Sequence, residues 1–395
     1  MSERYNQHSM TVSYEAYPTS VLHVGKYYPP HVGGMEKYLG ELVDYQSRRM
    51  AVEVVVSNDR LSTESEVLDG AKITRVASFG TVASQPICLS LPWRLKGHDE
   101  PLVHLHLPNP WAAQAYLMSG HKGKLVISHH ADTLGRPRLR RFVDPLVRRA
   151  MHRAAAIIVA SGRYLDSSQE LAEFRGKCRL IPYGIDVEAF NVERPEEARA
   201  IQTKYGSRLI VAVGRLVPYK GFEFLLQAMK HVNADLLLIG SGPEREQLQK
   251  MTERFGISGK AHLLGQVEDL APYYKASRLM VLPSITRAEA FGMVQVEAMA
   301  AGLPVVNTSL NSGVAEVSLH GVTGITVPPK DANALAEAIN LLLSNEEMRM
   351  KYGQAAKIRA QEEFSVRRMA ETTLELYREV LEGERKQCQQ KANLG

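Results

Sequence analysis

Short apolar runs alternate with helical patterns along both halves of the chain. The runs are residues 20–24, 51–56, 102–106, 124–128 and 156–160 in the first half, and 209–213, 235–239, 261–264, 279–283 and 304–307 in the second. Apolar runs with many β-branched residues are typical of strands buried on both faces of a parallel sheet. Helical periodicity separates them, for example over 221–231 and 335–343. The pattern predicts an α/β protein.

A polar stretch divides this pattern into two. Residues 191–207, NVERPEEARAIQTKYGS, are charged and include Pro195, a composition typical of an interdomain linker. A closed eight-fold barrel also alternates strands and helices, but the polar break favours two doubly wound units. We therefore expect a first domain over 1–190, a second over 191–370, and a C-terminal helix over 371–395 that can cross back to the first domain.

Composition narrows the class of protein. The 395 residues carry a formal net charge of only +5, which argues against a nucleic-acid binder because phosphate contacts need concentrated charge. Cys88, Cys178 and Cys388 are far apart, which excludes a disulfide framework and a cysteine zinc site. The first twenty residues lack the apolar stretch of a signal peptide, and no apolar run approaches the roughly 20 residues of a membrane span. We expect a cytoplasmic protein, at most peripheral at the inner face of a membrane.

The strongest chemical signal is the segment 287–306, RAEAFGMVQVEAMAAGLPVV. Glu289 stands on the loop before a predicted helix, and Glu297 lies about two turns inside it. The amides at the start of this helix, where the partial charge is positive and a diphosphate can bind, belong to Phe291, Gly292, Met293 and Val294. The alternative is an acidic residue favoured by the helix dipole and a solvated Glu297. Small apolar residues after Glu297 weaken that alternative.

Two cations follow another predicted strand. Arg215 leaves the apolar run 209–213, and Lys220 stands just before the next helix. Both therefore lie at the carboxyl edge of the sheet, where ligands bind in open α/β folds. They can hold a diphosphate together, although ordinary loop cations explain them equally well.

The first half offers two weaker signals. Gly33 and Gly34 open a predicted helix, where backbone can approach an anion or simply form a turn. His129, His130 and Asp132 follow the apolar run 124–128. These three can bind substrate hydroxyls or a metal, but a lone histidine in such a place is more often structural.

Taken together, these motifs resemble those of the retaining glycosyltransferases of family 4. The matching motifs are Gly33-Gly34, HHAD at 129–132, IPYGID at 181–186, GRLVPYKG at 214–221, GSGPE at 240–244, and the two glutamates Glu289 and Glu297 with seven residues between them. The resemblance spans about residues 21–364. It implies the GT-B fold, in which two doubly wound, Rossmann-like domains face a central cleft.

The resemblance also implies roles in binding a nucleotide diphosphate sugar. Arg215 and Lys220 are similar to the cations that hold the donor diphosphate, with the amides after Phe291 completing the site. Glu297 resembles the carboxylate that accepts bonds from the ribose hydroxyls. The backbone around Val267 is expected to meet the base.

Three further positions match residues of the family that lie near the transferred sugar. Glu289 and His130 resemble the residues that grip this sugar, and we place them as the catalytic pair. Gly33 and Gly34 resemble the loop that closes beside the phosphates and the acceptor.

The implied reaction needs no metal ion or other cofactor. The chain contains no Asp-x-Asp sequence, whereas metal-dependent transferases use paired carboxylates to hold a cation on the diphosphate. Fixed cations and helix amides are expected to neutralise the leaving group instead. The reaction is then transfer of a hexose to an acceptor hydroxyl with retention of the anomeric configuration. For such enzymes the acceptor attacks from the leaving-group face, so Glu289 positions and stabilises rather than forms a covalent bond.

The motifs around Lys220 and Glu289 are most similar to bacterial mannosyltransferases that use GDP-mannose in polysaccharide or glycolipid assembly. Mannose from GDP-mannose is therefore the favoured donor and UDP-sugars come second, with a glycan or lipid-linked acceptor. A GT-B epimerase or hydrolase that acts on the donor alone is one alternative. A non-catalytic sugar-nucleotide-binding protein is another. An NAD enzyme is disfavoured because no Gly-x-Gly-x-x-Gly sequence follows a strand.

Residues 136–153, RPRLRRFVDPLVRRAMHR, form a basic segment. From Arg136 to Arg153 they carry seven arginines against Asp144 alone, a local charge of +6. Interleaved apolar residues predict a surface-seeking amphipathic helix on anionic lipid. The alternative is a helix with its apolar side in the core and its arginines in water, and Pro145 interrupts the pattern.

Overall fold

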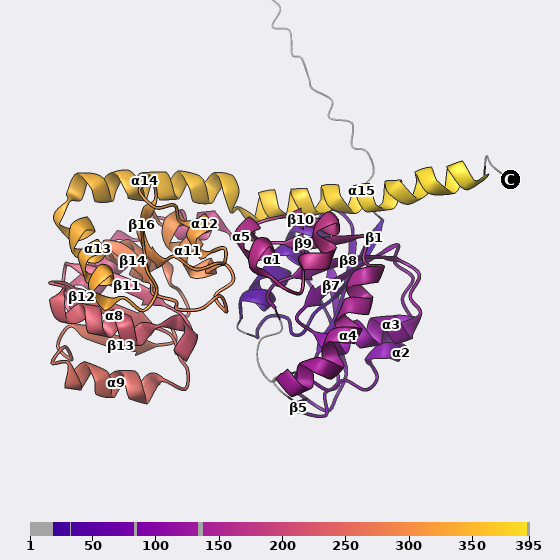
Figure 1. The fold of residues 1–395 in the computed structure, drawn as a ribbon, viewed down its shortest axis with the longest axis horizontal. Coiled ribbons are helices and arrows are strands. Elements are labelled where there is room, and N and C mark those ends of the chain that lie inside the picture. The colour runs from indigo at the N-terminus through magenta and orange to yellow at the C-terminus, as the bar shows by residue number, and fades with distance from the viewer. Residues whose placement is uncertain (1–18, 32, 83–84, 133–136, 393–395) are drawn as a thin grey trace, which may run out of the picture.

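The computed structural model describes residues 19–31, 33–82, 85–132 and 137–392. Two separate sheets, each accompanied by helices, form two lobes that lie side by side (Figure 1). The predicted α/β class, with a largely parallel sheet in each half, is confirmed.

The first lobe is built on an eight-stranded sheet in the order β10-β9-β8-β7-β1-β2-β4-β3. Its strands are β1 (Ser20–Val24), β2 (Ala51–Ser57), β3 (Glu64–Leu68), β4 (Ala71–Val76), β7 (Leu102–Leu107), β8 (Lys124–His129), β9 (Ala156–Val159) and β10 (Cys178–Leu180). They pair in parallel except for the antiparallel edge strand β3. A short hairpin pairs β5 (Thr81–Val82) with β6 (Gln85–Pro86). The helices are α1 (Gly34–Ser47), α2 (Leu91–Lys96), α3 (Pro110–Ser119), α4 (Pro137–Arg153) and α5 (Gly162–Ser167), followed by the 3₁₀ helix Ala172–Lys177.

The second lobe is built on a parallel six-stranded sheet in the order β13-β12-β11-β14-β15-β16. Its strands are β11 (Leu209–Val213), β12 (Asp235–Ile239), β13 (Ala261–Gly265), β14 (Leu279–Leu282), β15 (Val305–Thr308) and β16 (Gly324–Val327). The helices are α6 (Val187–Asn191), α7 (Pro195–Tyr205), α8 (Phe222–Ala228), α9 (Arg245–Arg254), α10 (Ala271–Ala276), α11 (Met293–Ala300), α12 (Val314–Val317), α13 (Ala332–Ser344) and α14 (Glu346–Glu363).

Each sheet has one point where the strand order reverses, and ligands bind beyond the carboxyl ends of the strands at such points. In the first sheet the order reverses between β1 and β7, so the chain after β1, which leads to α1, lies at this point. In the second sheet it reverses between β11 and β14. The segments that follow β11 and β14 carry most of the predicted donor-binding residues.

The polar stretch 191–207 is not an extended linker. It contains the helix α7, which begins at Pro195, where proline fits the first turn of a helix. The helix packs on α10, and the Gln202 side chain donates to the Ala276 carbonyl at 2.9 Å. The stretch separates β10 from β11 in the chain, while the domain limits proposed above stay a prediction.

The C-terminal helix α15 (Val366–Ala392) joins the lobes. It begins beside the second lobe and runs along the first, next to α1 (Figure 1). The Tyr45 hydroxyl of α1 donates to Glu371 at 2.8 Å, and the buried Tyr377 hydroxyl bonds to His104 of β7. Helix α15 therefore fixes one side of the first lobe relative to the second.

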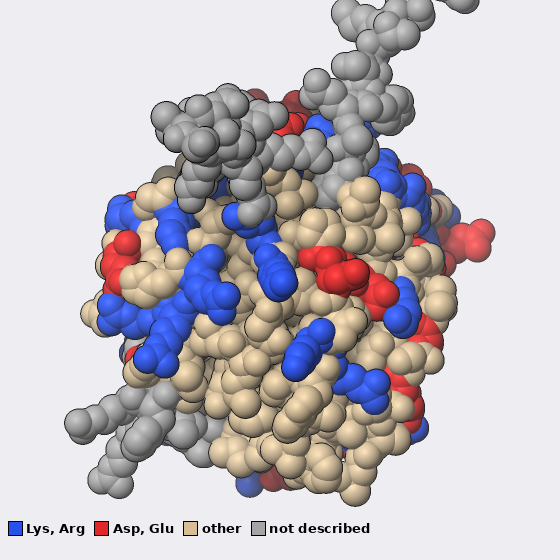
Figure 2. All heavy atoms as spheres, turned by 90° about the vertical axis from the view of Figure 1, so that its right-hand side faces the viewer, with Lys and Arg blue, Asp and Glu red and all other residues tan. Residues whose placement is uncertain are grey.

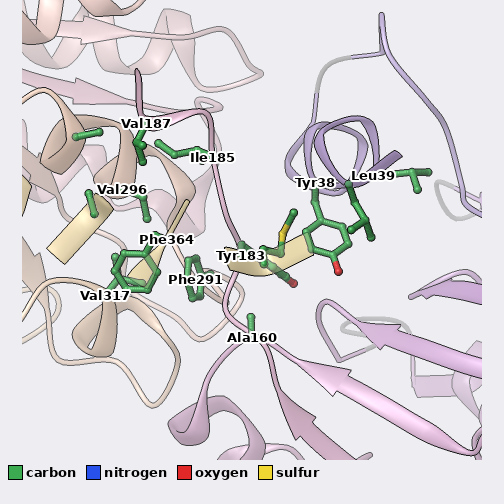
Figure 3. Packing of buried hydrophobic residues seen from close by; sticks show 14 of the residues in the cluster. Tyr38, Leu39, Ala160, Tyr183, Ile185, Val187, Phe291, Val296, Val317 and Phe364 are labelled. Carbon is green, nitrogen blue, oxygen red and sulfur yellow. The ribbon is translucent and has the colours of Figure 1, made fainter. Parts of the chain in front are cut away.

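Aromatic side chains carry one continuous apolar core from lobe to lobe (Figure 3). The Tyr38 ring of α1 lies 5.0 Å from the Tyr183 ring, which lies 4.9 Å from the Phe291 ring. Phe291 in turn meets Phe364 edge-on at 5.8 Å. The loop before α11 is thus packed directly against the first lobe.

Candidate functional site

A lysine and a glutamate meet where β11 and β14 end. The Lys220 Nζ atom lies 2.5 Å from Oε2 of Glu289, and the Ser284 hydroxyl donates to the same oxygen at 3.0 Å. Lys220 and Glu289 are both buried. Arg215, which follows β11, is exposed, and its side chain makes no hydrogen bond or ion pair with the residues that the structure describes. Arg215 is therefore available to an anion, whereas the charge of Lys220 is already balanced.

Helix α11 is preceded by a glycine, its N-cap, that no other residue can replace without strain. Gly292 has a φ of +78°, in the left-handed region, and a Cβ atom there would lie 2.7 Å from the Leu282 side chain. The first amides of a helix have no partner within it and carry partial positive charge. Those of Met293 and Val294 lie a few residues after Glu289. The predicted helix start is thus present, and its binding of an anion stays a prediction.

Glu297 lies inside α11 and receives two bonds. Its Oε1 atom lies 2.6 Å from Nζ of Lys37, which belongs to α1 of the first lobe. Its Oε2 atom accepts a bond from the Tyr274 hydroxyl at 3.0 Å. Burial, followed by the charge of Glu297, raises the pKa of Tyr274 well above its usual value, so this hydroxyl remains a donor. The alternative of a solvated Glu297 is excluded, because its side chain is only 6% exposed.

The first lobe brings the start of α1 to the same region. The helix begins at Gly34 with Gly33 as its N-cap, as the sequence predicts. A Cβ atom on Gly33 would collide with the Glu36 carboxylate. The pKa of Lys26 is lowered, mainly by burial. The nearby charge of Glu36 opposes this shift, and the charge of Arg215 adds to it. The charge of Arg215 therefore acts across the interface between the lobes.

His130 belongs to a chain of buried hydrogen bonds. Its Nδ1 atom lies 2.7 Å from the Tyr183 hydroxyl, and its Nε2 atom lies 3.2 Å from Nδ1 of His106. His106 continues to His23 at 3.1 Å, and Nε2 of His23 meets Oε1 of Gln46 at 2.8 Å. Because an amide oxygen only accepts, Nε2 of His23 must carry the proton that is donated to Gln46. The same order continues along the chain, so His23, His106 and His130 each carry one proton, on Nε2. Both ring nitrogens of His130 are then engaged within the protein.

Burial keeps these histidines neutral. It lowers the pKa of His23 to about 4 and that of His130 to about 3, and holds those of His104 and His106 well below the usual value. The ring nitrogens of His23, His104 and His106 lie close enough together for a metal ion. Each of these nitrogens already has a hydrogen-bond partner. The three histidines therefore suit a network of hydrogen bonds better than a metal site.

Charged contacts join the lobes away from Glu297. Arg287 of the second lobe lies 2.8 Å from Asp132 of the first and donates to the Ser167 carbonyl at 2.7 Å. Asp132, a candidate for substrate binding, is thus engaged by a cation. The Glu316 carboxylate accepts the backbone amides of Gly162 and Arg163 at 3.0 and 2.8 Å. The lobes therefore meet through paired charges as well as apolar contacts.

The predicted site residues fall into two groups. The structure gathers Arg215, Lys220, Glu289, the start of α11 and Glu297 beyond the carboxyl ends of two neighbouring strands. Val267 follows β13 and packs against the shared core. His130 lies in the first lobe and reaches this region through Tyr183, whose ring contacts Phe291. The roles assigned to all of them stay predictions.

The sequence did not single out Lys37, Tyr274 or Arg287. Lys37 carried only a weak signal, because a lysine near the start of a helix is slightly disfavoured by the helix dipole. Tyr274 and Arg287 carried none. Their partners, Glu297 and Asp132, are distant in sequence and depend on how the lobes meet.

The chain is similar to known glycosyltransferases. Residues 193–359 match the model of the family described as glycosyl transferases group 1, and residues 32–189 match that of glycosyltransferase family 4. The chain is 28% identical to the O-antigen chain mannosyltransferase C of Escherichia coli, over 92% of this chain and 99% of that protein. It is 27% identical to a GDP-mannose-dependent alpha-(1-6)-phosphatidylinositol monomannoside mannosyltransferase of Mycolicibacterium smegmatis, over 84% of this chain and 91% of that protein.

Solved structures share the fold. Sucrose-phosphate synthase from Thermosynechococcus elongatus superimposes with a TM-score of 0.77 at 22% identity, over 92% of this chain and 100% of that one. HepE of Anabaena in complex with UDP-glucose gives a TM-score of 0.74 at 20% identity, over 90% of this chain and 98% of that one. At these identities the likeness shows the architecture alone.

Because the buried histidines stay neutral, we predict that the free energy of unfolding decreases when the pH is lowered. Between about pH 6.5 and pH 4 the unfolded chain takes up protons that the native protein cannot, so the free energy of unfolding decreases as pH falls. From pH 7 to pH 5 the loss should be roughly 2 kcal/mol for each buried histidine. Urea unfolding at the two pH values measures it. His106→Gln should reduce the loss by about one histidine's share, whereas His231→Gln, at an exposed position, should not. Equal losses in all three proteins would contradict the explanation.

Proposed function

The chain belongs to glycosyltransferase family 4 and has the GT-B fold, and from this premise we propose that it transfers a hexose from a nucleotide diphosphate sugar to an acceptor hydroxyl. The observation that carries the proposal is the grouping of Arg215, Lys220, Glu289 and the start of α11 at one edge of the second sheet. Cations and helix amides that converge in this way suit a diphosphate. Glu297, two turns into α11, suits the ribose hydroxyls.

The same residues account for departure of the nucleotide without a metal ion. As the bond to the sugar breaks, negative charge grows on the diphosphate, and fixed donors aimed at that charge stabilise the transition state. Arg215 and the amides of Met293 and Val294 supply such donors. Lys220 supplies another once its bond to Glu289 loosens. The reaction is metal-independent in this proposal.

We assign Glu289 an electrostatic and positioning role. Its carboxylate is buried and bound by Lys220 and Ser284, so it is held in place and poorly suited to act as a free nucleophile. The acceptor hydroxyl then attacks the anomeric carbon from the same face of the sugar as the departing nucleotide diphosphate, and the configuration at this carbon is retained. A diphosphate oxygen takes the acceptor proton. His130 contributes next to the sugar through its packing with Tyr183, since its ring nitrogens are engaged.

The donor that we propose is GDP-mannose, and the acceptor is a glycolipid or polysaccharide precursor. The support is the similarity to an O-antigen chain mannosyltransferase and to a GDP-mannose-dependent enzyme, both matched over most of their length. A UDP-sugar is the competing donor, because HepE, which shares the fold, was solved with UDP-glucose.

We propose a contact with an anionic membrane surface that is electrostatic only, without the insertion of an apolar helix face into the lipid. In the described part of α4, Val147, Ala150 and Met151 pack into the core, so these residues offer lipid no free apolar face. Arg148 pairs with Glu173, and Arg136 lies outside the described residues. No described helix is long and apolar enough to span a membrane. The end of the first lobe carries scattered Lys and Arg side chains, with a cluster of acidic ones beside them (Figure 2). The Lys and Arg side chains support an electrostatic contact at the inner face of the membrane.

Removing a diphosphate cation should weaken nucleotide binding. Arg215→Ala loses charge-assisted hydrogen bonds worth about 1.5–3 kcal/mol, which raises the dissociation constant roughly 10- to 100-fold. Lys220→Ala should act in the same direction. Calorimetric titration with GDP and UDP measures both. Arg254→Ala removes an exposed arginine of α9 and serves as the control. Unchanged affinity in Arg215→Ala and Lys220→Ala would refute the diphosphate assignment.

Transfer itself can be tested on the purified enzyme. We expect mass spectrometry to show a hexose added to a polyprenyl-linked saccharide when GDP-mannose is the donor, with the same yield in excess EDTA. Loss of activity in EDTA that divalent metal restores would refute the metal-independent reaction. Consumption of the donor without any acceptor product would favour the epimerase or hydrolase alternative. No turnover with any GDP- or UDP-sugar, combined with tight binding, would favour a non-catalytic binding protein.

A further inference from the structure

Lys37 occupies the position that the proposed function gives to the donor ribose. It extends from α1 of the first lobe, one turn past Gly33 and Gly34, to the carboxylate of Glu297 in the second lobe. The Lys37 ammonium and the Tyr274 hydroxyl each bond to one oxygen of this carboxylate, at 2.6 and 3.0 Å. Both oxygens that a ribose diol would need therefore already have a donor.

The burial of the pair shows that ribose cannot simply be added to it. The Glu297 side chain is 6% exposed and the Lys37 side chain 37% exposed. The ring of Phe190 lies 5.3 Å from the Lys37 ammonium. A ligand as large as ribose therefore reaches the buried Glu297 only if one of the two side chains moves. Lys37 is the more exposed of the two and is the one that can move.

Lys37 has a second acidic neighbour on its own helix. Glu41 lies one turn further along α1, at the i, i+4 spacing that brings two side chains together. Burial raises the pKa of Glu41, and the charge of Lys37 lowers it. The lysine can thus leave Glu297 without losing every opposite charge.

We propose that Lys37 is a displaceable occupant of the ribose site, which the ribose hydroxyls of the donor replace. In the empty enzyme it neutralises Glu297 and holds α1 of the first lobe against α11 of the second. Donor binding exchanges one set of bonds to Glu297 for another and turns Lys37 toward Glu41. After transfer, the lysine competes with the nucleotide diphosphate for the same carboxylate and so favours its release. The inference rests on the proposed function, which assigns Glu297 to the ribose.

The test is nucleotide affinity in a variant that keeps the shape of the lysine but not its charge. In Lys37→Met, calorimetric titration with GDP and UDP should give dissociation constants about three- to tenfold lower than in the wild type, since the competitor is gone. Lys37→Arg keeps the charge and should bind like the wild type. Lys37→Gln is a second neutral variant in case the methionine impairs folding.

Two results would overturn the proposal. Weaker binding by both neutral variants would make Lys37 a direct ligand of the donor, and unchanged binding would make the ion pair a contact with no part in donor exchange. Glu297→Gln separates this inference from the proposed function. Glu297→Gln should weaken nucleotide binding both in the wild type and in Lys37→Met. In the presence of Glu297→Gln, Lys37→Met should no longer change the dissociation constant. If Glu297→Gln leaves the affinity unchanged while Lys37→Met still raises it, Glu297 does not bind the ribose, and the proposed displacement of Lys37 from a ribose site is overturned together with that assignment.

Discussion

A carboxylate that is buried where two lobes meet must be paired, because an isolated charge out of water is costly. Glu297, Glu289 and Asp132 are three such carboxylates, and their partners are Lys37, Lys220 and Arg287. Two of the three pairs cross from one lobe to the other. Any ligand that uses these carboxylates must exchange bonds with a cation that is already there.

The fold explains why these charges gather in one place. In a parallel sheet every strand delivers the residue after it to the same edge. The second sheet reverses its order between β11 and β14, so that the loop with Lys220 and the loop with Glu289 lie side by side. The first sheet reverses next to β1, which leads to α1 and Lys37. The apolar contact between Tyr183 and Phe291 holds the two edges against each other.

Much of this could be predicted from the sequence, since the central strands are apolar on both faces. The strands at 20–24 and 209–213 follow directly from that pattern. The edge strand β3 was missed because ESEVL is exposed throughout, and β4 because its burial is interrupted by the exposed Lys72. Arg215, Lys220 and Glu289 were found because each lies on a segment between a predicted strand and the next predicted helix. Lys37 was missed because its partner lies 260 positions away in sequence, and only the packing of the lobes brings the two together.

The central claim is that a nucleotide diphosphate binds where the lobes meet, at the start of α11. Hydrogen exchange with and without saturating GDP or UDP tests it directly, because bound phosphate should protect the otherwise free amides of a helix start. We predict increased protection over residues 289–297 and 213–221, with little change in α9 or α13. Protection confined to segments outside these two, or none with either nucleotide, would contradict the account.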